Sequence, residues 1–185
     1  RFISRWNQGG FWNLMAIDKI LSASLGSGVG GKIGQVLTTE ITAFTFSSTA
    51  STPVAITDLS RTITPSATSS KILVMGKISF GSGNQARGYV QLRRGTTLIG
   101  NSTAGGSRII SIASDQIASV NDVANVNFNY IDSPSTNSEV TYNIYGCAEG
   151  GSNFLLNRSI NDSDGNTVTR GTSVITVMEV LAWVT

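Results

Sequence analysis

The chain has 185 residues, the length of one domain of ordinary size, and 13% of them are charged, about half the usual share. Its 13 basic and 11 acidic residues are scattered, which argues against a nucleic-acid partner, and no apolar run approaches the ~20 residues of a membrane span. Because the chain has no histidine and a single cysteine, Cys147, it lacks the residues of a Ser-His-Asp, Cys-His or tetrahedral zinc site, and we expect no enzymatic activity, cofactor or metal centre.

Residues 1–14 are aromatic and basic, and they follow neither a helical nor a strand period. One interpretation is an anchoring arm whose aromatic side chains insert into a partner. The other is that Met15 is the natural start, so that residues 1–14 are translated upstream DNA. The candidate anchors of the arm are Phe2, Trp6, Phe11 and Trp12.

Residues 15–25, MAIDKILSASL, place Ile17, Ile20 and Leu21 at helical spacing. We expect a short amphipathic helix here that docks on a partner, because about three helical turns are only marginally stable alone in water. These three residues join the candidate anchors of the arm.

The stretch GSGVGGKIG, residues 26–34, matches the GxGxxG spelling of a dinucleotide-binding turn and comes close to a phosphate-binding loop. Both motifs need a strand before the glycines and a helix after them, whereas here a short helix precedes and a strand follows. Ile33 also stands where the phosphate loop needs a hydroxyl. The stretch is therefore interpreted as a linker, which divides the chain into an attachment segment, residues 1–31, and a head domain, residues 32–185.

From residue 32 onward the sequence predicts about ten short strands separated by turns, which is typical of an all-β sandwich or barrel. Residues 125–132 and 139–146 alternate apolar and polar side chains, and Arg94-Gly95 indicates a hairpin turn. Cys147 is expected to be a buried apolar residue of a strand. The other segments with strand patterns are residues 32–46, 60–80, 86–100 and 171–184.

Two polar motifs remain open at this point. Asp162 and Asp164, in NDSDGNT, either form a loose surface ion site or belong to a plain polar turn, because the spacing does not fit a calcium loop of the EF-hand type. Asn101, Asn157 and Asn161 match the spelling of a glycosylation acceptor.

Three stretches of the head are similar to the small β-sandwich modules of tail fibres and other virion appendages in tailed bacteriophages. They are ITPSATSSKILVMGKISF (63–80), YIDSPSTNSEVTYNIYG (130–146) and GTSVITVMEV (171–180), and MAIDKILSASL resembles the leaders of such proteins. The resemblance implies an antiparallel jelly-roll-like sandwich, assembly as a homotrimer, and an N-terminal segment that attaches to other virion proteins. It supplies no catalytic motif.

We therefore expect a non-enzymatic virion structural protein at the particle surface, a tail fibre, head fibre or capsid decoration subunit. Host-receptor or glycan binding is expected, if present, in loops 101–107, 115–125 or 161–171, since loops on a rigid sandwich commonly bind partners. The alternative is a soluble carbohydrate-binding module or lectin with no virion role. Capsid or tail location, the receptor and the oligomer size are left open by the sequence.

Overall fold

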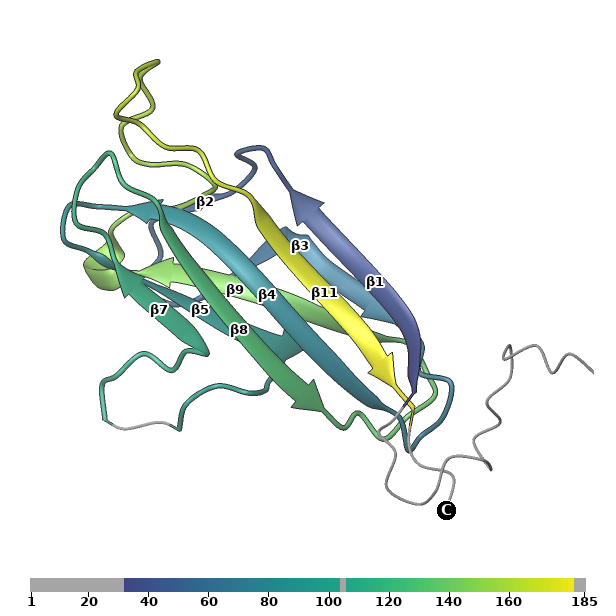
Figure 1. Ribbon diagram of the computed structural model, residues 1–185. Helices are drawn as coiled ribbons and strands as arrows, with labels where there is room; N and C mark the ends of the chain where they lie inside the picture. The colour runs from purple at the N-terminus through teal and green to yellow at the C-terminus, as the bar shows by residue number, and fades with distance from the viewer. Residues whose placement is uncertain (1–31, 104–105, 182–185) are drawn as a thin grey trace, which may run out of the picture. The chain divides into compact units, whose positions relative to one another are not determined.

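The computed structural model describes residues 32–103 and 106–181 (Figure 1). The predicted arm and helix, with all their candidate anchors, lie outside these residues. The described part is all-β, and its one helical element is a single 3-10 turn, η2 (Glu149–Gly151). The predicted fold class, an antiparallel sandwich with jelly-roll character, is confirmed for the head.

The first sheet contains four long strands in the order β1-β11-β4-β8, all antiparallel (Figure 1). Two short strands extend this sheet beyond Ser173, the first residue of β11. There β10 pairs with the last residues of β4, and β2 pairs with β10. The bounds are β1 (Ile33–Ile41), β2 (Ser47–Ser48), β4 (Lys71–Ser82), β8 (Ala124–Asp132), β10 (Phe154–Leu156) and β11 (Ser173–Val180).

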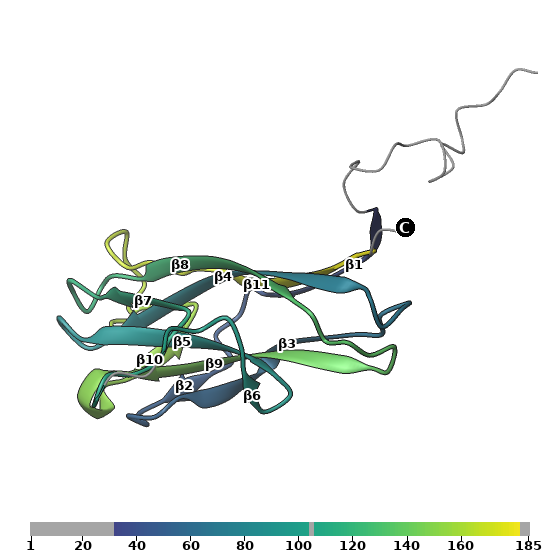
Figure 2. The same ribbon diagram turned by 90° about the horizontal axis from the view of Figure 1, so that it is seen from below.

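The second sheet has the order β3-β9-β5, and the outer edge of β5 pairs with β7 and β6 in turn. Its strands form the other layer of the sandwich (Figure 2). The bounds are β3 (Val54–Ile63), β5 (Arg87–Arg94), β6 (Thr97–Leu98), β7 (Ala113–Gln116) and β9 (Val140–Ala148). The β5–β6 hairpin turns at Gly95, whose φ of 57° suits glycine, as the sequence predicts.

The order of these strands defines a jelly roll. The chain passes from one sheet to the other and back, so that the last main strand, β11, pairs with the first, β1. The eight main strands are β1, β3, β4, β5, β7, β8, β9 and β11. In the same way β9 pairs with β3, and the orders β1-β11-β4-β8 and β3-β9-β5-β7 face each other.

Strand alternation fills the space between the sheets with aliphatic side chains. On β4, Ile72, Val74 and Ile78 are fully buried, and Ile175 and Val177 of β11 are buried beside them. Cys147 is also fully buried, as predicted, and burial raises the pKa of its thiol to about 11.

Two phenylalanines of the first sheet fit against two glycines of the second. The rings of Phe80 and Phe154 are stacked with their centroids 4.7 Å apart. A Cβ atom on Gly88 would lie 2.0 Å from the Phe80 ring, and one on Gly146 would lie 2.7 Å from the Phe154 ring. The stacked rings therefore occupy the space that side chains at these two glycine positions would fill.

A buried carboxylate joins the two sheets at another point. Asp132, at the end of β8, is 5% exposed and accepts hydrogen bonds from the Tyr142 hydroxyl at 2.7 Å and from the Arg94 guanidinium at 2.8 Å. Burial, together with this hydrogen bond, raises the pKa of Tyr142. Both partners belong to the second sheet, so the interaction ties β8 to β9 and β5.

The glycine at position 88 gives a direct test of the packing. Gly88→Ala is expected to lower the free energy of unfolding by about 1–3 kcal/mol, because the new methyl group overlaps the Phe80 ring. Gly165→Ala is the matched control, since its Cβ would contact nothing closer than 3.9 Å, and it should change stability by less than about 0.5 kcal/mol. Urea unfolding followed by circular dichroism measures both; equal stabilities for the two variants would contradict the packing described.

Candidate functional site

The outer face of the first sheet has a straight row of apolar side chains across all four long strands. Val36 on β1 pairs with Met178 on β11, Met178 pairs with Leu73 on β4, and Leu73 pairs with Ile131 on β8. We call these four residues the apolar row. The two at the edges are largely exposed, Val36 at 53% and Ile131 at 60%, and the two between them are partly exposed.

One charged side chain, the exposed Lys71 of β4, lies next to the apolar row, where it pairs with Val180. Val180 and the 47% exposed Ile33 pair with each other on one side of the row, and on the other side Thr176 pairs with Met75. Three strand spacings of ~4.8 Å give the row a span of about 14 Å. A contiguous apolar strip of this kind on a solvent face is typical of a protein interaction surface.

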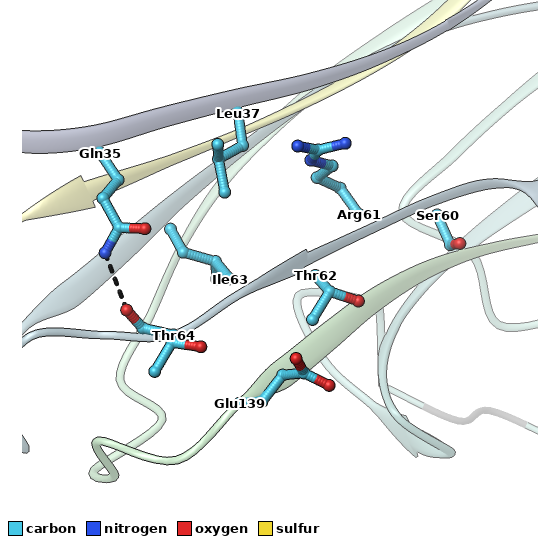
Figure 3. Close-up of a pocket in the computed structure, with 8 residues that line it drawn as sticks. All are labelled: Gln35, Leu37, Ser60, Arg61, Thr62, Ile63, Thr64 and Glu139. Atoms are coloured by element: carbon cyan, nitrogen blue, oxygen red, sulfur yellow. Dashed lines mark hydrogen bonds between the residues drawn. The ribbon is translucent and has the colours of Figure 1, made fainter.

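A second feature is an open cleft of about 450 Å³ between the edge strands β1 and β3 (Figure 3). Side chains of β1 bridge the two sheets there: Gln35 donates to the carbonyl of Thr64 at 2.8 Å, and Thr39 donates to the carbonyl of Ser60 at 2.9 Å. The aliphatic residues of the lining are Leu37 and Ile63, and Ile63 is 2% exposed and belongs to the core.

Arg61 is the one cationic residue among those that line this cleft. It lies in alternation with the buried Leu59 and Ile63 on β3, so its side chain belongs to the face of β3 that is turned toward β1 (Figure 3). Its Nε atom is buried and has no hydrogen-bond partner.

Next to the cleft, Glu179 is a nearly inaccessible carboxylate on the inner face of β11. It accepts hydrogen bonds from the Ser66 amide at 2.6 Å, from the Ser66 hydroxyl at 2.7 Å and from Gln35 at 3.0 Å. Burial by itself raises the pKa of Glu179, but the hydrogen bonds from Ser66 and Gln35 outweigh it and hold the pKa below the usual value.

Asp162 and Asp164 belong to a polar loop, and the structure favours that interpretation over an ion site. The Asp162 carboxylate pairs with Arg158 at 3.0 Å and with Arg170, so two guanidinium groups already neutralise it, while Asp164 is exposed. Within residues 32–103 and 106–181, no three His, Cys, Asp or Glu side chains are grouped to hold a metal ion.

The glycosylation spelling is misleading at Asn157. This residue is 1% exposed, has a positive φ of 61°, and donates its amide to the carbonyls of Ile41 and Ala43. Its role is to tie the end of β1 to the rest of the first sheet, and no sugar can reach its nitrogen. The amides of Asn101 and Asn161 donate to Leu92 and Asn121, respectively.

The predicted site and the observed features do not overlap. All the candidate anchors are outside the described residues and stay predictions: Phe2, Trp6, Phe11, Trp12, Ile17, Ile20 and Leu21. The sequence analysis missed the apolar row and the position of Arg61. A signal for the row was present in residues 173–180, SVITVMEV, where apolar side chains fall on both faces of the strand.

Comparisons with known proteins do not assign this chain to a family. No protein-family model and no curated protein matches the chain. Among solved structures, the chain is similar to one of the infectious bursal disease virus Gx strain, with 15% identity and a TM-score of 0.37 over 80% of this chain and 38% of that one. It is also similar to the VP2 subviral particle of infectious bursal disease virus, with 14% identity, a TM-score of 0.33 and the same two coverages.

The chain thus spans little more than a third of the length of either viral protein. Likenesses with TM-scores below 0.5 decide nothing about its function. For the part of the chain that the structure describes, no helix is long and apolar enough to cross a membrane.

The hydrogen bonds of Glu179 predict a pH dependence. Because its folded pKa is lowered, its ionised form stabilises the head above a pH of about 4.5, and this contribution is lost as the pH falls through the folded pKa. Glu179→Gln should lower the free energy of unfolding by about 1–3 kcal/mol at pH 7 and by less at pH 3. Urea unfolding at the two pH values measures this; Glu40→Gln, on an exposed position of β1, is the control, and an effect of Glu179→Gln that is equal at both pH values would contradict the assignment.

Proposed function

We propose that the chain is a non-enzymatic structural subunit of a bacteriophage virion, an appendage or decoration protein at the particle surface. Residues 1–31 attach it to other virion proteins, and the jelly-roll head is displayed outward. The head assembles as a homotrimer. Support for the class of protein comes from the three stretches of the head that resemble phage appendage modules, and support for assembly comes from the surface of the head.

The observation behind the assembly is the apolar row. Both inner faces of the sandwich are already packed against each other, so no described residue covers the side chains on the outer face of the first sheet, and contact with a further protein surface would remove them from water. Two of these side chains are more than half exposed, and they stand in line with two further apolar residues. A second copy of the chain is the partner we propose.

The jelly roll itself does not choose between the two candidate functions, since virus capsid domains and lectins both use it. A monomeric carbohydrate-binding module has no need of apolar side chains in contact across its outer face. The apolar row therefore favours an assembling subunit over a monomeric lectin.

The proposed self-association is tested by substituting a charged residue into the apolar row. Ile131→Lys, at the 60% exposed end of the row, should raise the dissociation constant of the homo-oligomer at least tenfold, because the interface would have to bury an unpaired ammonium group. Thr97→Lys, exposed on β6 of the other sheet, adds the same charge and should leave association unchanged. Sedimentation velocity over a range of concentrations measures both, and equal behaviour of the two variants would exclude the row as the interface.

Attachment is tested separately by deletion. A chain that lacks residues 1–31 should keep the circular dichroism and the unfolding midpoint of the head but be missing from purified particles of the phage that encodes it. The physical reason is that the core and both sheets are formed by residues after 31. A shortened chain that still copurifies with particles at the wild-type copy number would contradict the proposed role of the segment.

A further inference from the structure

Two methionines are diagonal neighbours on the outer face of the first sheet. Met178 on β11 pairs with Leu73 on β4, and Met75 follows two residues later on β4 with its side chain on the same face. Diagonal neighbours of this kind lie about 7–8 Å apart, within reach of long side chains. Both side chains are partly exposed, and Met178 belongs to the apolar row while Met75 borders it. The thioether groups of the described residues therefore lie on the surface proposed for self-association.

A thioether reacts with a peroxide wherever the two can meet, because its sulfur needs no deprotonation. A lone pair of the sulfur attacks one oxygen of hydrogen peroxide, the O–O bond breaks, the S–O bond of a sulfoxide forms, and water leaves. The sulfur is thereby oxidised by two electrons and the peroxide is reduced. The product is polar and chiral where the methionine was apolar, and methionine sulfoxide reductases reverse the change.

The cysteine that would compete for the peroxide is protected. Cys147 is fully buried, and burial raises the pKa of its thiol to about 11, so nearly all of it is protonated at neutral pH. The thiolate is the form of cysteine that attacks an oxidant. Among the sulfur-containing side chains of residues 32–103 and 106–181, the two methionines are therefore the accessible ones.

We propose that Met178 and Met75 are oxidation sites for peroxides, and that their sulfoxides block self-association through the apolar row. A sulfoxide oxygen on Met178 would stand between Val36 and Leu73, whose side chains have no hydrogen-bond donor. Burying such a polar group without a donor is unfavourable, whereas the free chain leaves it in water. A formed interface covers the same sulfur atoms, so oxidation acts on the free chain and assembly protects against it. The effect on association rests on the proposed function, and the site of oxidation does not.

The oxidation sites are tested by peptide mapping of the full chain after treatment with a fixed excess of hydrogen peroxide. Mass spectrometry measures the gain of oxygen at each residue, so Met15, which lies outside the described part, is counted separately. Met178 and Met75 should become sulfoxides while Cys147 stays reduced. At protein concentrations where the chain self-associates, oxidation of Met178 should slow. Oxidation of Cys147 ahead of both methionines, or methionines that resist peroxide in the folded chain, would overturn the assignment.

The effect on association is measured by sedimentation velocity on the untreated and the oxidised chain. Oxidation should raise the dissociation constant of the homo-oligomer about tenfold or more, and methionine sulfoxide reductase should restore it. The double variant Met75→Leu with Met178→Leu is the control for damage elsewhere in the chain. Its dissociation constant, whatever the untreated value, should not change in peroxide, and a change as large as that of the wild-type chain would overturn the inference.

Failure of the proposed function gives a different result. If the untreated chain stays monomeric, the apolar row is not a self-association surface, and the inferred block of association falls with it while the mapped oxidation sites stand. If the untreated chain associates and full oxidation of Met178 leaves the dissociation constant unchanged, the proposed self-association stands and the inferred effect of oxidation is overturned.

Discussion

The contact of two stacked phenylalanines with two glycines sets the arrangement of the sandwich. Phe80 and Phe154 extend from the first sheet into space that Gly88 and Gly146 leave open in the second. Since each ring fits only where the facing strand lacks a side chain, the contact fixes how β4 and β10 lie over β5 and β9. The rest of the core, and the bond from Tyr142 to Asp132 across the sheets, depends on that alignment.

With the inner faces packed, two of the remaining surfaces of the described residues differ in chemistry. The outer face of the first sheet presents the apolar row, which suits a protein partner. The open side between β1 and β3 contains polar side chains, with Arg61 on β3 and with Gln35 and Thr39 donating from β1 across the two sheets.

The sequence predicts the fold better than the site. The strands around residues 71–80 and 173–180 follow from apolar runs and alternation, whereas β7 was missed because ASDQ is polar, and β10 was missed because its place is set by the distant stacking of Phe154. Alternation counted from the buried Ile56 puts Arg61 on the outside; the irregularity after Ala55 reverses the faces and turns it inward. The apolar row depends on the register of four strands, which a single sequence does not contain.

The central claim, that the chain is a virion subunit, is tested most directly by quantitative mass spectrometry of purified phage particles. Peptides from the head, residues 32–181, are measured against a known capsid protein, with the host lysate as the comparison. The account predicts that the chain copurifies with particles at a copy number that is a multiple of three. Its absence from particles, with the protein recovered only from the soluble lysate, would contradict the account.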